Sequence, residues 1–253
     1  MTLPLAVQAG LWGLLSGSAL LIGAVIGWYV PLSRRTIAGI MAFGAGVLIS
    51  ALSFELMEEA WEQGGLWPVA TGFLVGALVY TLANLLLARA GAKHRKRSAP
   101  EVREEHPREA NAQALALGAL LDGIPESIVI GISLLGGGAV GLVAVAAVFL
   151  SNLPEGLSSA AGMKAEGKSA GYTFALWSGI ALASAASATV GYAAFDGAAP
   201  AVTGFIQAIA AGAILAMVVD TMVPEAFEGT HDFAGLIAVS GFLLAFALSQ
   251  SAS

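Results

Sequence analysis

Apolar runs long enough to cross a bilayer recur along almost the whole chain. A helix of about 20 residues spans the roughly 30 Å hydrocarbon core of a membrane. The first run, from Met1 to Ser33, has no charged residue and no basic segment of the kind that opens a signal peptide, so we expect a true membrane span. Because hydrocarbon offers no hydrogen bonds to the backbone, such runs fold as helices. The sequence predicts an all-α membrane protein.

The number of these runs sets the expected architecture. Of the 253 residues, 57% are hydrophobic and 11% are charged, whereas a soluble domain has about 25% charged residues. The absence of cysteine excludes a disulfide scaffold, a cysteine-ligated zinc site and an iron–sulfur protein. Eight transmembrane helices are predicted, at residues 1–33, 36–54, 63–88, 110–133, 140–163, 172–195, 202–223 and 233–250.

Basic residues fix the expected orientation of the helices. All 11 lysines and arginines fall between runs one and two, three and four, or five and six, which share one side of an eight-span protein. The positive-inside rule makes that side cytoplasmic, so both termini are expected to be extracytoplasmic in a multi-pass protein of the cell membrane. Residues 89–109 form the expected cytoplasmic polar loop, within a single transport domain of residues 1–253. So few basic residues make nucleic acid an unexpected partner.

Parts of the chain resemble one another at a constant spacing. Ala45–Leu48 resembles Ala211–Ile214, and Glu59–Glu62 resembles Glu225–Glu228, in each case 166 positions later. Residues 123–127 similarly resemble residues 152–156. In the eight-span topology each pair runs in opposite directions, which predicts a 3+2+3 inverted repeat, a feature of secondary transporters. The alternative explanation is that helices rich in small residues look alike by composition.

Three acidic residues lie inside the apolar runs. Charged side chains are costly at the bilayer centre, so Asp122, Glu126 and Glu155 must face protein, a cavity or a cation. Asp122 and Glu126 are four residues apart and share a helix face, as do Asn152, Ser151 and Glu155. The alternative is a protonated contact between acids or between an acid and an amide that holds two helices together. Asp220, near the end of the seventh run, is a candidate for an exit path.

A proline precedes each of the two glutamates. Pro125 and Pro154 cannot donate a backbone hydrogen bond, so the carbonyl groups of Leu121 and Leu150 lose their helical partners. Freed carbonyls at membrane depth are tolerated where they line a cavity or meet an ion. Two such helices facing each other would make an oxygen-rich cage for a divalent cation.

These motifs resemble those of the ZIP (Zrt-, Irt-like) family of divalent metal transporters, in its prokaryotic form. The family typically has His-Asn-x-Pro-Glu-Gly in span four and a second Pro-Glu-Gly motif in span five. Here residues 122–127 read DGIPES and residues 151–156 read SNLPEG. By position, the resemblance makes Asp122 the counterpart of a metal-binding histidine and Glu126 and Glu155 the shared carboxylates. Asn152 and Ser151 complete the implied ligand set.

The resemblance implies transport of a divalent cation towards the cytoplasm, with zinc as the expected ion and iron or manganese as alternatives. Gly123 has no side chain to offer, and no glutamate follows Ser178-Gly179, so one metal site is expected. The expected partners are the lipid bilayer, the ion and, as an open alternative, a second copy in a homodimer, with no prosthetic group. A membrane metal-binding or sensing protein that does not transport is the alternative function. An enzyme is not expected, because no predicted span holds a histidine or cysteine.

Overall fold

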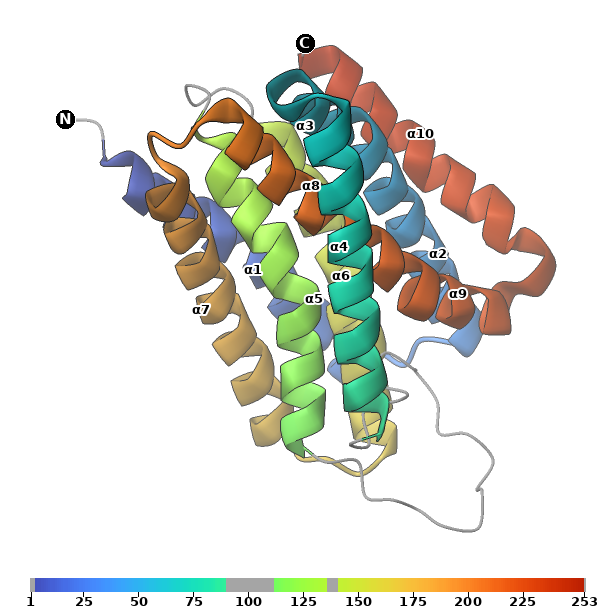
Figure 1. Ribbon diagram of the computed structural model, residues 1–253. Helices are drawn as coiled ribbons and strands as arrows, with labels where there is room; N and C mark the ends of the chain where they lie inside the picture. The colour runs from blue at the N-terminus through green and yellow to red at the C-terminus, as the bar shows by residue number, and fades with distance from the viewer. Residues whose placement is uncertain (1–2, 90–111, 136–140, 253) are drawn as a thin grey trace.

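The computed structural model describes residues 3–89, 112–135 and 141–252 of the chain (Figure 1). All of the regular structure in these described ranges is helical, with no strand among them. The polar loop predicted at residues 89–109 lies outside the described residues, apart from Arg89. The starts of the predicted fourth and fifth spans, at residues 110 and 140, lie outside them too.

The helices follow the apolar runs in order. They are α1 (Leu5–Tyr29), α2 (Arg34–Ala51), α3 (Met57–Gly64), α4 (Leu66–Leu87), α5 (Ala112–Ser133), α6 (Gly141–Ala165), α7 (Ala170–Phe195), α8 (Pro200–Met217), α9 (Val223–Thr230) and α10 (Ala234–Ala252). Five described segments are long and apolar enough to cross a membrane: Leu5–Tyr29, Arg34–Gly64, Leu66–Leu87, Ala170–Phe195 and Pro200–Ser251. The protein therefore has the helices of a multi-pass membrane protein.

Local sequence signals set several helix starts. The Ser33 hydroxyl accepts a 3.1 Å hydrogen bond from the Thr36 backbone N–H, which caps α2. The Ser169 hydroxyl caps α7 in the same way through the N–H of Tyr172, at 3.2 Å. Gly65 separates α3 from α4 with a φ of 68°, a left-handed conformation that glycine adopts without strain. Each of these residues marks the start of a helix, so the loop before it is short.

The second and seventh predicted spans are longer than expected, and each contains a wide turn. The π-helical segment η1 (Leu52–Leu56) joins α2 to α3, and the π-helical segment η3 (Val218–Met222) joins α8 to α9. The predicted ends of these spans at residues 54 and 223 are therefore wrong, because the wide turns carry the helices on to residues 64 and 230. Every bound of α2, η1 and α3 recurs 166 positions later in α8, η3 and α9, as from residue 34 to residue 200.

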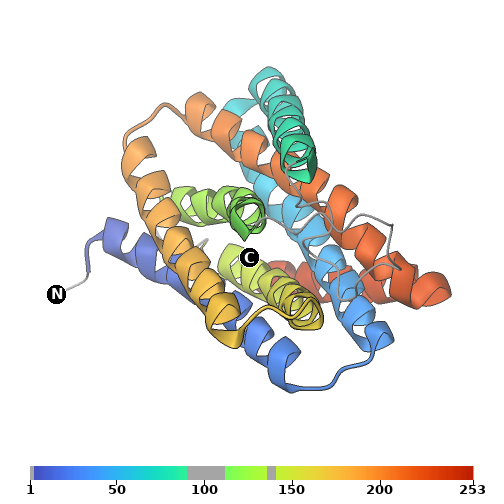
Figure 2. The same cartoon turned by 90° about the horizontal axis from the view of Figure 1, so that it is seen from below.

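The long helices pack in two groups. One contains α1, α5, α6 and α7, in which α6 packs on α1, α5 packs on α7, and α1 packs on α7. The other contains α2, α4, α8 and α10 with the short helices α3 and α9, and its main pairs are α4 with α8 and α2 with α10. Seen from below, α5 and α6 lie in the centre of the molecule, between α1 and α7 on one side and the second group on the other (Figure 2).

Glycines let neighbouring helices approach closely within each group. A Cβ atom at Gly46 would lie 1.8 Å from the Ala238 carbonyl oxygen of α10, and one at Gly212 would lie 2.0 Å from the Phe73 carbonyl oxygen of α4. Gly46 and Gly212 are again 166 positions apart. Backbone-to-backbone packing of this kind is typical of helices in membranes.

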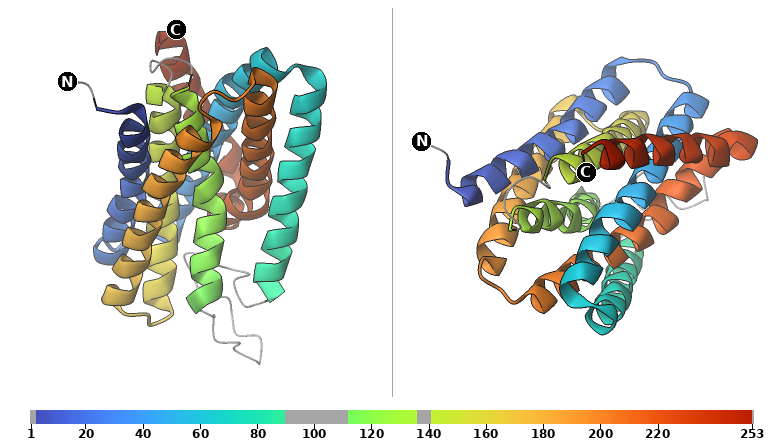
Figure 3. Two further views of the ribbon diagram at one scale, coloured as in Figure 1. Left: turned by 60° about the vertical axis from the view of Figure 1, so that its left-hand side comes forward. Right: turned by 90° about the horizontal axis from the view of Figure 1, so that it is seen from above.

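The helices α1 and α7 run in opposite directions. α1 and α7 lie side by side, and α1 starts at the end of the bundle where α7 finishes (Figures 1 and 3). The start of α1 and the end of α10 lie towards the same end of the molecule (Figure 3). The two groups thus place α5 and α6 where both halves of the chain surround them.

Candidate metal centre

All five of the predicted site residues are buried on α5 and α6. Their side chains retain 4% or less of their accessible surface: Asp122, Glu126, Ser151, Asn152 and Glu155. Burial of charged carboxylates in a bundle of this kind requires compensation by hydrogen bonds or by a cation. Polar atoms are therefore concentrated in the centre of the molecule, on the two helices that both halves of the chain enclose.

Asp122 has a partner that the sequence does not indicate. The hydroxyl group of Tyr80, on α4, donates a 2.7 Å hydrogen bond to Oδ1 of Asp122. Tyr80 retains only 1% of its accessible surface. A buried tyrosine usually finds a partner for its hydroxyl group, so the one tyrosine within the apolar run of residues 63–88 is the signal that could have pointed to Tyr80. This bond connects the two helix groups.

Asn152 and Ser151 are held by nearby backbone groups. The amide nitrogen Nδ2 of Asn152 donates a 3.1 Å hydrogen bond to the carbonyl oxygen of Ser16 on α1. Asn152 is thereby tied to the helix that packs on α6, and the amide oxygen is the atom with which it can bind a metal ion. The Ser151 hydroxyl donates to the Val148 carbonyl within α6, at 2.9 Å, and keeps its own oxygen as an acceptor.

The two prolines do not interrupt their helices. α5 continues through Pro125 and α6 continues through Pro154. The Pro154 ring sits against Gly44 of α2, where an added Cβ would be 2.5 Å from the ring carbon Cγ. A Cβ atom added at Gly23 of α1 would lie 2.1 Å from the carbonyl oxygen of Leu153. The turn that carries Glu155 is thus clamped between glycines of two neighbouring helices.

Asp122, Glu126 and Glu155 are not arranged as a metal-binding cluster. Among the residues that the structure describes, no group of three or more histidine, cysteine, aspartate and glutamate side chains is arranged to hold a metal ion. Asp122 is instead bonded to Tyr80. A metal ion at this place would therefore draw on two carboxylates at most in the present arrangement, together with amide, hydroxyl or carbonyl oxygens, which suit hard divalent cations.

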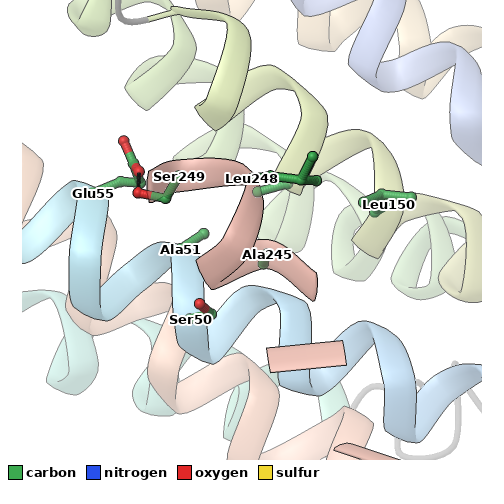
Figure 4. Close-up of a pocket in the computed structure, with 8 residues that line it drawn as sticks. Ser50, Ala51, Glu55, Leu150, Ala245, Leu248 and Ser249 are labelled. Atoms are coloured by element: carbon green, nitrogen blue, oxygen red, sulfur yellow. Dashed lines mark hydrogen bonds between the residues drawn. The ribbon is translucent and has the colours of Figure 1, made fainter. Parts of the chain in front are cut away.

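A pocket lies between α6, α10 and the helix formed by α2 and η1 (Figure 4). Glu55 of η1 lies at one side of it, where its Oε1 accepts a hydrogen bond from the Ser249 hydroxyl of α10. None of the five predicted residues lines the pocket, but Leu150 directly precedes Ser151. The lining residues are Ser50, Ala51, Glu55, Ala147, Leu150, Ala245, Leu248 and Ser249.

A fourth buried acid lies outside the predicted set. Glu225 on α9 retains 7% of its accessible surface, and its Oε1 accepts a 3.2 Å hydrogen bond from the Ser158 hydroxyl of α6. Asp220, the candidate for an exit path, is exposed. The sequence placed Glu225 within a repeated segment, but it gave no sign that this side chain would be buried.

Comparison with known proteins shows what the chain is similar to. No family model matches the chain. The chain is 31% identical over 215 residues to an Arabidopsis thaliana protein named "Putative zinc transporter". The alignment covers 82% of this chain but 32% of that protein, so the chain spans about a third of the length of the relative that it matches. Over most of its own length, the chain is similar to a protein named for zinc transport.

Proposed function

We propose that the chain transports a divalent metal cation, with zinc as the principal ion, across the cell membrane towards the cytoplasm. The observation that carries this proposal is the burial of five oxygen-bearing residues on two Pro-Glu helices at the centre of an apolar bundle. Similarity to a protein named as a zinc transporter and the ZIP-like motifs support the same function.

In this proposal Glu126 and Glu155 supply the charges that bind the ion. The amide oxygen of Asn152 and the hydroxyl oxygen of Ser151 complete its coordination. Asp122 becomes a further ligand of the ion when its hydrogen bond with Tyr80 breaks. Because metal binding requires deprotonated carboxylates, protons compete with the ion for the site. An all-oxygen site also accepts manganese or iron, so both ions belong in the test.

The transport movement follows from how the helices are grouped. Eight spans in a 3+2+3 inverted arrangement, with extracytoplasmic termini, would let α5 and α6 open alternately to each side. The bounds that recur 166 residues apart support this arrangement. Because α5 packs on α7 and α6 packs on α1, these four helices would move as one body against the second group.

Influx into liposomes tests the proposal. The purified protein is reconstituted, and uptake of Zn²⁺, Mn²⁺ and Fe²⁺ is followed with a fluorescent indicator inside. We expect influx with the wild type and none above empty liposomes with the Glu126→Ala, Glu155→Ala double variant.

The matched control removes two exposed acids, Glu58 and Glu62, with the same change in charge. The Glu58→Ala, Glu62→Ala variant should keep the wild-type influx. Unchanged influx in the Glu126, Glu155 variant would contradict the site. Metal binding by the wild type without influx would instead support the alternative, a metal-binding or sensing protein.

A further inference from the structure

Glu225 is a buried carboxylate that the proposed central site does not use. It lies on α9, in a segment apolar enough to cross a membrane, and it retains 7% of its accessible surface. Its hydrogen bond from the Ser158 hydroxyl joins it to α6, the helix that carries Glu155. The carboxylate of Glu225 and the hydroxyl group of Ser158 thus bring two oxygen ligands together at this position, and oxygen ligands suit hard divalent cations.

Polar side chains continue along α6 from the central site to Glu225. Ser158 and Ser159 follow Glu155 by three and four residues, so they lie on the same face about one turn further along the helix. Both serines are buried, with 0% and 4% of their accessible surface exposed. Asn152, Glu155 and these two serines thus form a row of oxygen atoms on one buried face, with Glu225 beside its far end.

The corresponding acid in the first half of the chain has a different environment. Glu59 of α3 lies 166 positions before Glu225, and its Oε1 accepts a 3.0 Å hydrogen bond from Gln63 on the same helix. Glu59 is half-buried, whereas Glu225 is buried and bonded across to α6. Of this pair, Glu225 is the acid with a hydrogen bond to the helix of the central site.

We propose that Glu225, with Ser158 and Ser159, forms a second divalent-cation site one turn beyond Glu155, which the ion occupies after leaving the central site. This inference rests on the proposed transport function. The hydroxyl oxygens and a single carboxylate make this site weaker than one with two carboxylates, as release to the cytoplasm requires. An ion moving along α6 would exchange the oxygens of Asn152 and Glu155 for those of Ser158 and Glu225.

Zinc binding and zinc influx together test the second site. Equilibrium dialysis of purified wild-type protein should show a tight and a weaker class of bound zinc. The Glu225→Gln variant keeps the size of the side chain and an oxygen that accepts the Ser158 hydrogen bond, so a purely structural role predicts no change. A metal-binding role predicts that the weaker class loses at least about tenfold in affinity. Maximal influx should fall several-fold with little change in KM.

Three variants separate the possible results. Glu59→Gln, at the matched position, should leave both classes and the influx unchanged, and Glu126→Gln should remove the tight class alone. If Glu225→Gln fails to fold, as judged by gel filtration, the Ser158→Ala, Ser159→Ala variant must show the loss of the weaker class. Retention of that class and of influx in a folded Glu225→Gln or double-serine variant would overturn the second site and leave the central site standing. No zinc binding and no influx in the wild type would overturn the transport function itself.

Discussion

The hydroxyl group of Tyr80 donates a hydrogen bond of 2.7 Å to the carboxylate of Asp122, and this bond joins α4 to α5. Both side chains are buried, and the two helices belong to different packing groups. The resemblance to the ZIP family implies that Asp122 is a metal ligand, and its Oδ1 accepts the hydrogen bond from Tyr80. In the proposed transport cycle this link between the two groups loosens when Asp122 joins the ion.

Removal of the Tyr80 hydroxyl should destabilise the protein. A hydrogen bond to a charged group contributes about 1.5–3 kcal/mol, so Tyr80→Phe should lower the free energy of unfolding by about that amount. Denaturation in detergent micelles measures the effect, and a double-mutant cycle with Asp122→Ala, which removes the acceptor oxygen, isolates the pair. Tyr29→Phe is the control, because Tyr29 is 66% exposed. Additive effects of the Tyr80 and Asp122 substitutions would contradict the coupling.

Close helix packing predicts that replacing either of two matched glycines, Gly46 or Gly212, lowers the stability of the protein to a similar degree. Gly46→Ala and Gly212→Ala would each place a Cβ within 2.0 Å of a backbone carbonyl oxygen on the neighbouring helix. Overpacking of this kind costs about 1–3 kcal/mol, so both variants should unfold at lower denaturant concentration. Gly179→Ala is the control, because nothing lies within 4 Å of its added Cβ and alanine favours the helix. Wild-type stability in either variant would show that the helices pack less closely than described.

The chain has no cysteine, which allows a direct test of the topology. Single cysteines are placed at three exposed positions, Ser33, Glu166 and Asp196, and intact cells are treated with a membrane-impermeant maleimide. The positive-inside rule predicts labelling at Asp196 and no labelling at Ser33 or Glu166 until the cells are opened. The reverse pattern would show that the protein has the opposite orientation in the membrane. Labelling of all three cysteines from outside would refute the span assignment.

Transport should weaken in acid. Protons compete with the metal ion for the carboxylate oxygens of Glu126 and Glu155, so a lower pH outside the liposomes should raise KM for zinc. Because the effect is competitive, saturating zinc should restore most of the influx. The measurement is initial influx at several external pH values with an ionophore that removes the proton gradient. A fall in maximal rate with an unchanged KM would argue against proton competition at the site.

The sequence predicted the helices best where glycine, proline and serine mark their ends. The predicted sixth run, residues 172–195, lies within α7, whose start is capped by Ser169. The wide turns η1 and η3 were not predicted, because hydropathy does not distinguish a π turn from an α turn. These turns lengthened two predicted spans to residues 64 and 230.

The sequence predicted those features of the candidate site that depend on spacing within a single helix. The spacing of Asp122 and Glu126, and of Asn152 and Glu155, identified polar faces that the structure buries. The partners of these faces come from distant parts of the chain: Tyr80 is 42 residues from Asp122, and Glu225 is 67 residues from Ser158. Such contacts depend on how whole helices pack, which no local pattern encodes.

The two π-helical segments change how a helical-wheel projection must be drawn for the helices that contain them. A π turn closes its hydrogen bond one residue later than an α turn, so the direction of the side chains shifts by about one residue, or roughly 100°. A helical wheel drawn at constant pitch through residues 34–64 or 200–230 is therefore out of phase beyond Leu56 and Met222. Glu59 and Glu225 both lie in the displaced part, and a scanning mutagenesis series across either helix must be indexed separately on the two sides of its π turn.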